Sequence, residues 1–108
     1  MSRHPATADA FTAIADPTRR RLLDLLAEGE RTVLNLAEPF RMTLSAVSQH
    51  LKLLRQAGFV KVRKSGRERY YRLDPRPLRQ VADWVGPYER FWRDKLEALG
   101  DHLDRNPT

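Results

Sequence analysis

The pattern of hydrophobic and polar positions divides the chain into a helical first half, a short alternating segment and a helical end. In the first half, apolar residues recur three and four positions apart, which is the spacing of a helix with one buried face. This spacing predicts helices over residues 7–15, 17–28, 32–38 and 43–57. Their expected boundary residues are Asp16, Pro17 and Gly29 for the second helix, Thr32 and Pro39 for the third, and Thr43 and Gly58 for the fourth.

Between residues 59 and 73 the hydrophobic period changes to two. Apolar and basic residues alternate there in two runs, which predicts two strands joined by a turn at Ser65-Gly66. From Leu78 the chain becomes helical again, with an interruption expected near Gly86-Pro87.

These elements fit one small domain, because 108 residues is a usual length for one. The order of the elements predicts a mainly α fold with a β-hairpin. Within residues 1–108 we expect a flexible end at 1–6, a helix-turn-helix over 32–58, a hairpin over 59–73 and a C-terminal helix over 78–105.

The composition removes several classes of protein. The chain has no cysteine, which excludes disulfides, thiolate nucleophiles, thiol-based redox sensing and cysteine-ligated metal sites. No apolar run approaches the roughly 18 residues of a membrane span, and the N-terminus lacks the apolar core of a secretion signal. We therefore expect a cytoplasmic protein without a membrane partner.

The excess positive charge lies in one segment. The net charge is +6, from 20 basic and 14 acidic residues. Residues 52–73 hold eight of the basic side chains and a single acid, Glu68, whereas the rest of the chain is nearly neutral. Such a block is compatible with a solvated basic surface, but its concentration favours a surface that binds nucleic acid.

The fourth expected helix gathers its polar residues on one face. At 100° per residue, its apolar side consists of Leu44, Val47, Leu51 and Leu54. The opposite side carries Ser45, Gln49, Lys52 and Gln56, with Ser48 at its edge. Short hydroxyl and amide groups suit close approach to base edges and phosphates. A short helix, a turn and this helix predict a helix-turn-helix, and the basic hairpin after it predicts a wing.

Catalytic and metal-binding interpretations of the same helix have little support. His50 stands on the flank of the helix without a carboxylate or second histidine one turn away on that face, so neither a general base nor a metal site is expected. Ser45 and Ser48 lack the base and oxyanion donors that a serine nucleophile needs. Solvent exposure is the alternative to DNA contact, and we expect no enzyme and no cofactor.

An ordered set of motifs resembles the ArsR type of winged helix-turn-helix repressor. The matching motifs are Ala15-Asp16-Pro17-Thr18-Arg19, Leu36-Ala37, Ser45-Ala46-Val47-Ser48-Gln49-His50-Leu51-Lys52-Leu53-Leu54, Ala57-Gly58-Phe59-Val60 and, in the hairpin, Gly66-Arg67 with Tyr70-Tyr71-Arg72-Leu73. They cover roughly residues 8–103. The resemblance implies a homodimeric repressor whose terminal helices pair and whose release from DNA is triggered by a ligand.

The candidate DNA contacts divide into base readers and phosphate contacts. Gln49 can bond bidentately to adenine, so it is the first candidate for base readout, followed by Ser45. Contacts to the DNA backbone, or to the minor groove from the wing, are expected from Thr43, Ser48, His50, Lys52, Lys64, Arg67 and Arg69. Arg19, Arg20 and Arg21 point in different directions on a helix, so they are expected to meet solvent or to form intramolecular salt bridges.

A dimer interface is expected at the terminal helices. The last helix has no further element to bury its apolar stripe, and aromatic residues are enriched at interface cores. A ligand pocket is the alternative interpretation of this stripe. The expected interface residues are Phe11, Trp84, Tyr88, Phe91, Trp92, Leu96 and Leu99.

No metal sensor is expected. The family that the chain resembles often senses metals through cysteines in the third helix or through histidines and carboxylates on the last. Asp101, His102 and Asp104 lack a second histidine on that helix, and zinc normally takes three or four converging ligands. An organic effector, a protein antagonist or no ligand remain as alternatives.

The leading hypothesis is therefore a sequence-specific, dimeric repressor that binds double-stranded DNA. The alternatives are a non-specific architectural protein that binds nucleic acid, a metal-responsive member of the same family, and an interaction adaptor whose winged helix no longer binds DNA.

Overall fold

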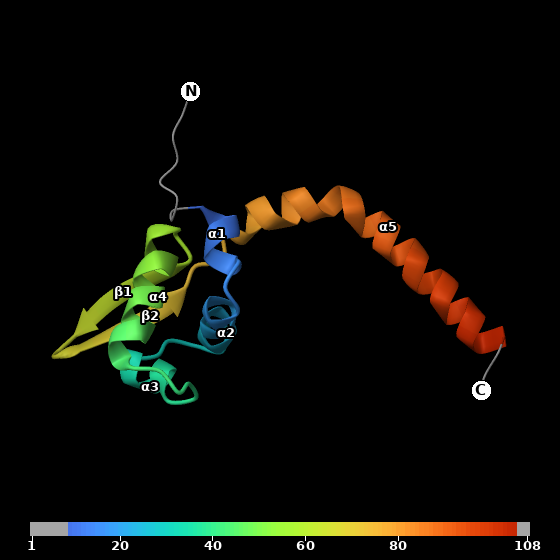
Figure 1. Cartoon of the computed structure of the whole chain (residues 1–108). Helices are drawn as coiled ribbons and strands as arrows, with labels where there is room; N and C mark the ends of the chain where they lie inside the picture. Colours follow the sequence, from blue (N-terminus) through green and yellow to red (C-terminus); the bar gives the residue numbers. More distant parts are fainter. Residues whose placement is uncertain (1–8, 106–108) are drawn as a thin grey trace, which may run out of the picture. The chain divides into compact units, whose positions relative to one another are not determined.

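The computed structural model of the chain describes residues 9–105, with side chains described for residues 9–100. In this part of the chain it contains helices and one antiparallel hairpin, as predicted (Figure 1). The helices are α1 (Ala10–Ile14), α2 (Pro17–Leu26), α3 (Val33–Ala37), α4 (Leu44–Gln56) and α5 (Leu78–Arg105), and the strands are β1 (Val60–Ser65) and β2 (Glu68–Leu73). The flexible end expected at residues 1–6 lies outside the described residues.

The chain forms two compact units, Met1–Leu78 and Arg79–Thr108. The first contains α1 to β2 and all the buried apolar side chains of the described residues, and the second contains α5 from Arg79 onward. No described helix is long and apolar enough to cross a membrane.

The core of the first unit lies under α4, which contacts α2, α3 and β1. Its largest fully buried side chains are Leu22, Leu36, Val47, Leu51, Leu54, Phe59 and Val60. Two details differ from the prediction, in which helical spacing buries Leu22, Leu25 and Leu26 on α2 and places Leu44 on the buried side of α4. Leu23 is buried on α2 while Leu25 is half-buried, and Leu44 is 46% exposed because it begins α4 beyond the edge of the core.

The predicted starts of α2, α3 and α4 are confirmed, whereas α1 begins at Ala10 with Asp9 as its N-cap, later than the predicted residue 7. The side chains of Asp16, Thr32 and Thr43 each accept a hydrogen bond from the amide three residues later, at 3.0, 3.2 and 3.0 Å. These bonds satisfy amide groups that the first turn of a helix leaves without partners. At the other ends, Gly29 and Gly58 follow α2 and α4 with φ of 145° and 84°, a region that favours glycine. α2 ends at Leu26, two residues before the predicted end.

The hairpin pairs Val60 with Leu73 and Ser65 with Glu68. The connecting residues are therefore Gly66 and Arg67, one position later than the predicted turn. Gly66 has a φ of 63° and no described residue other than glycine has a positive φ, so the loop matches a type II′ turn.

A bridge that the sequence does not reveal ties the hairpin to the helices. The amide of Arg31 donates to the carbonyl of Tyr71 at 3.0 Å, and the amide of Tyr71 donates back at 2.8 Å. Arg31 lies in the loop between α2 and α3, so this pair fastens β2 to the start of the helix-turn-helix.

The last helix is continuous, so the interruption predicted at Gly86-Pro87 is wrong. Pro87 lies inside α5 and removes one amide donor from the helix. Figure 1 shows a bend within the orange part of this helix. The surrounding helical pattern outweighs the loss of one hydrogen bond, and proline bends the element rather than ending it.

Candidate nucleic-acid interface

The outer face of α4 presents short polar side chains. Ser45, Ser48, Gln49 and Lys52 are all exposed, whereas Val47 and the other buried residues of the helix point into the core. Because the core fixes the rotation of α4 about its axis, these side chains form one surface. Thr43 is also exposed, with its hydroxyl engaged as the N-cap of the helix.

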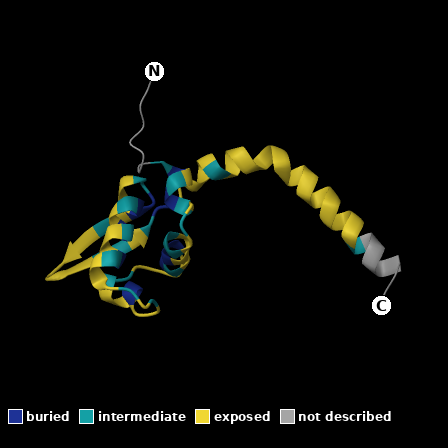
Figure 2. Cartoon of the chain, viewed as in Figure 1, coloured by how far each residue is buried: buried dark blue, intermediate teal, exposed yellow. Residues whose placement is uncertain are grey.

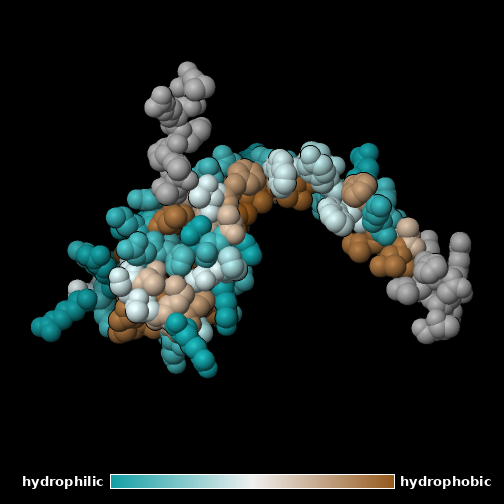
Figure 3. Space-filling model, viewed as in Figure 1, coloured by the Kyte–Doolittle hydropathy of each residue, from teal (hydrophilic) through white to brown (hydrophobic). Residues whose placement is uncertain are grey.

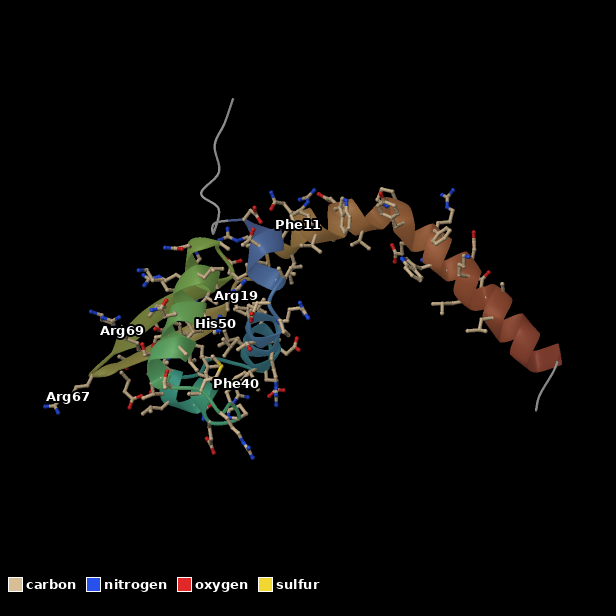
Figure 4. The ribbon with its side chains drawn as sticks, viewed as in Figure 1. Phe11, Arg19, Phe40, His50, Arg67 and Arg69 are labelled. Atoms are coloured by element: carbon tan, nitrogen blue, oxygen red, sulfur yellow. The ribbon has the colours of Figure 1, made fainter. Side chains whose placement is uncertain are left out.

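His50 occupies the flank of α4 and is half-buried. Its Nδ1 atom lies 3.4 Å from a guanidinium nitrogen of Arg19 on α2. In Figure 4 the two labelled residues lie next to each other. His50 therefore points toward another part of the first unit, not along the outer face formed by Ser45 and Gln49.

The three consecutive arginines of α2 make intramolecular contacts, although their partners are not the carboxylates of a salt bridge. Arg19 and Arg20 donate to backbone carbonyls at the end of α1. Arg21 lies over the ring of Phe40, 5.2 Å from its centre, which joins α2 to the turn between α3 and α4.

Part of the basic charge of residues 52–73 is neutralised by carboxylates of the same chain. Arg63 donates three hydrogen bonds to the carboxylate of Glu30 at 3.0–3.1 Å, and its guanidinium carbon lies 4.7 Å from the centre of the Tyr70 ring. Lys61 lies 3.9 Å from the carboxylate of Asp74. These two cations therefore belong to the attachment of the hairpin.

Three other cations of the wing are exposed. Lys64 and Arg69 face each other across the strands, and Arg67 lies in the turn at the tip. Among the described residues, no carboxylate lies within ion-pairing distance of these three or of Lys52. Like charges this close repel each other and gain stability from a bound polyanion.

A surface groove brings the helix and the wing together. It has a volume of about 410 Å³ and is lined by Thr32, Val33, Leu34, Ser48, Arg67, Glu68, Arg69 and Tyr71. Ser48 comes from α4 and the two arginines come from the wing, so hydroxyl and guanidinium donors line one depression. Leu34 adds an apolar side chain that is 66% exposed.

The carboxylates that hold this part of the fold are ionised. Hydrogen bonds from Arg76, opposed by burial and aided by the charges of Arg76 and Lys61, lower the pKa of Asp74 to about 2. The hydrogen bond from Arg63 lowers the pKa of Glu30. Burial alone would raise the pKa of Asp16, but the amide of Arg19 and the nearby charges bring it below its usual value.

The second unit carries a long exposed apolar stripe. In Figure 2, α5 is almost entirely coloured as exposed, and in Figure 3 hydrophobic side chains follow it. The exposed fraction of the predicted interface residues of this helix is 53–65%. These residues are Trp84, Tyr88, Phe91, Trp92, Leu96 and Leu99, while Phe11 on α1 is 41% exposed.

The last turns of α5 carry the two aspartates and the histidine that the sequence analysis considered as a metal site. The side chains of Asp101, His102 and Asp104 lie outside the described residues. Within the described part of the chain, no three histidine, aspartate or glutamate side chains gather in a group that could hold a metal ion.

Sequence reasoning missed the residues that attach the wing. Arg31 bonds to the carbonyl of Leu25 and to Asn35 and Glu28, in addition to its bridge with Tyr71. Its partners come from three separate segments, so no periodic pattern reveals it. The sequence predicts that the hairpin ends at residue 73, but nothing in its pattern indicates the ion pair between Asp74 and Arg76 that follows.

Comparison with known proteins places this geometry in context. The family model described as bacterial regulatory protein, arsR family, matches residues 16–62, which extend from the start of α2 into β1. Transcriptional repressor SdpR of Bacillus subtilis is 38% identical over 77 residues, covering 71% of this chain and 86% of that protein. HTH-type transcriptional regulator Rv2034 of Mycobacterium tuberculosis is 36% identical over 104 residues, covering 96% and 94%.

Solved structures agree. A crystal structure of an ArsR family transcriptional regulator, RHA00566, has a TM-score of 0.68 and 36% identity, covering 77% of this chain and 91% of that one. A crystal structure of a "possible transcriptional regulator for arsenical resistance" has a TM-score of 0.66 and 49% identity, covering 87% and 95%. Both the sequence and the fold are thus similar over most of the chain.

Proposed function

The chain belongs to the arsR family of bacterial regulatory proteins, and from this premise we propose that it acts as a homodimeric repressor on a twofold site in double-stranded DNA. Membership makes the protein a sequence-specific DNA-binding transcriptional regulator of the winged helix-turn-helix class, and not an enzyme. The dimer, the contacts and the form of the site are the proposed part.

One observation supports the assignment of the DNA-binding surface to α4 and the wing. The exposed polar face of α4 and the unpaired cations of the wing meet at the same groove, where Ser48 lies with Arg67 and Arg69. We assign base readout to Gln49 and Ser45, because amide and hydroxyl groups can bond to base edges in the major groove.

The cations take a different role. Lys52, Lys64, Arg67 and Arg69 would neutralise phosphates, which positions the protein without specifying sequence. Thr43 and Ser48 would add hydroxyl contacts to the backbone. His50 would contribute mainly through Arg19, since its Nδ1 faces that side chain.

We propose that two copies pair through the apolar stripe of α5 together with Phe11 on α1. Exposed aromatic side chains in such number on one helix are typical of an interface core. Two recognition helices related by a twofold axis would then meet half-sites about one helical turn apart, on the order of 34–36 Å.

The proposed repressor acts in the cytoplasm, where it meets the chromosome. Any effector would be recognised without thiolates, because the chain has no cysteine. That leaves an organic molecule or a protein antagonist as the releasing agent, or repression without an effector.

Selection of bound duplexes from a random DNA pool tests this function. The proposal predicts enrichment of an inverted repeat. Equal recovery of unrelated sequences, with a steep dependence of affinity on salt, would instead indicate a non-specific architectural protein. Adding a panel of metal ions to the selected complex should leave DNA binding unchanged. Release of the DNA by zinc would contradict the expectation that the protein does not sense metals.

A further inference from the structure

Arg19 connects α1 to the recognition helix through one guanidinium group. Its Nε donates to the carbonyl of Ala13 at 2.8 Å, and its Nη2 donates to the carbonyl of Thr12 at 2.9 Å. Both carbonyls belong to the last turn of α1. The remaining nitrogen, Nη1, faces His50 on α4 at 3.4 Å. A single side chain of α2 thus contacts both α1 and α4.

The backbone of Arg19 is fixed as well. Its amide donates to the carboxylate of Asp16 at 3.0 Å, in the cap that starts α2. This cap fixes the backbone of Arg19, and the two bonds to α1 fix its guanidinium plane. The third guanidinium nitrogen therefore faces the His50 ring, although 3.4 Å is long for a hydrogen bond. The contact depends on three fixed points and not on a mobile surface side chain.

The chemistry of the contact also fixes the state of His50. A guanidinium group has donors and no acceptor, so the nitrogen facing it must accept. The neutral ring therefore carries its proton on Nε2. A proton on Nδ1 would point at the donors of Arg19 and break the contact between α1 and α4.

The distance from α1 to α4 matters in a dimer, and this step rests on the proposed function. α1 has five residues, of which Ala10 and Ala13 are buried, and Phe11, which is 41% exposed, belongs to the proposed interface. In a twofold complex, the separation of the recognition helices sets the spacing of the half-sites that they reach. The distance from α1 to α4 within each copy therefore affects where its recognition helix lies on the DNA.

We propose that Arg19 is a positioning residue that sets this connection. By holding the α1 carbonyls and the His50 ring at once, it fixes the distance between α1, which carries the proposed interface residue Phe11, and the recognition helix, and so selects the half-site spacing that the protein accepts.

The test compares Arg19→Lys with Arg20→Lys. Lysine keeps the positive charge but cannot reproduce three donor contacts in one plane. Arg20 is a matched control, because it donates to the Ile14 carbonyl at 2.7 Å at the same end of α1, and none of its described hydrogen bonds reaches α4. Affinities are measured for the selected inverted repeat and for duplexes with the half-sites one or two base pairs closer or farther apart.

Wild type and Arg20→Lys should lose about tenfold in affinity for each wrong spacing, while Arg19→Lys should lose about threefold or less. An unchanged spacing profile in Arg19→Lys would overturn the proposal. If the wild-type protein selects no inverted repeat, the proposed dimeric function fails instead, and the inference about Arg19 is then judged by the free protein alone.

Nitrogen NMR of the His50 ring in the free protein supplies that second readout. At about pH 7.5, where an ordinary histidine is neutral, wild type and Arg20→Lys should show the Nε2–H tautomer, and Arg19→Lys should show a mixture. A wild-type ring with its proton on Nδ1, a doubly protonated wild-type ring, or an unchanged ring in Arg19→Lys would each contradict the proposed contact.

Discussion

At the scale of single residues, α4 separates groups that carry base information from groups that carry charge. Gln49 and Ser45 are uncharged and exposed near the middle and start of the helix, whereas Arg67 lies at the tip of the wing. An amide can distinguish one base pair from another in the major groove, but a phosphate contact cannot. The two kinds of residue should therefore fail in different ways when they are removed.

Gln49→Ala should weaken binding to the selected site by about 1–3 kcal/mol and abolish the preference at one position of each half-site. Arg67→Ala should weaken binding to all sequences and reduce the slope of log affinity against log salt by about one. Binding curves for a set of single-base variants at several salt concentrations measure both. Equal loss of base preference in the two variants would refute this division of roles.

Residue positions on α4 follow from its sequence because helical periodicity assigns each side chain to a face. Periodicity placed Ser45, Ser48 and Gln49 on the exposed side, where the structure has them. It placed Leu44 in the core, which is wrong because the first residue of a helix can lie beyond the elements that cover the rest. The partner of His50 was not predictable, since Arg19 is 31 positions away.

At the scale of elements, the wing is held by contacts at its base. The Arg31 bridge joins β2 to the loop before α3, and Glu30 holds Arg63 on β1. Beyond the hairpin, Asp74 accepts hydrogen bonds from the Arg76 backbone and guanidinium at 2.6–3.1 Å, and its own amide donates to the carbonyl of Phe59 at 2.7 Å. The order of elements was readable from the sequence, but these bonds between segments were not.

The Asp74 carboxylate should make stability depend on pH. Its pKa is about 2 in the folded protein against an ordinary value of 3.8, so its contribution is present above about pH 4 and is lost as the pH falls toward 2. Asp74→Asn should lower the thermal unfolding midpoint at pH 7, and the difference from wild type should shrink near pH 2.

The matched control for this substitution is Asp24→Asn, which makes the same change in charge on the exposed surface of α2. It should leave the midpoint nearly unchanged at both pH values. A constant difference between Asp74→Asn and wild type from pH 7 to pH 2 would contradict the role given to the carboxylate.

At the scale of the whole molecule, the two units differ in how far they bury their own apolar side chains. The first unit buries its own core, whereas α5 exposes aromatic and aliphatic side chains along its length. Exposed apolar surface of this kind is stabilised by a partner. Its apolar period predicted the helix, but a single sequence cannot show whether a second copy or another surface covers it.

Leu96→Glu should disrupt the proposed pairing. Leu96 is 65% exposed in the single chain, and a carboxylate enclosed in the interface without a partner would cost about 3–5 kcal/mol. Sedimentation equilibrium should show a dimer for wild type and mostly monomer for the variant. Arg90→Gln, which makes the same change in net charge on the polar side of α5, should remain dimeric. Dimers that persist in Leu96→Glu would exclude this surface as the interface.

In the proposed complex, a dimer places two winged helices on a twofold DNA site. Hydroxyl-radical footprinting of wild-type protein on the selected duplex tests it most directly. We expect two equivalent protected regions related by the twofold axis and about one helical turn apart, both weakened together by Leu96→Glu. A single protected region that is insensitive to Leu96→Glu, or protection spread evenly along the duplex, would contradict it.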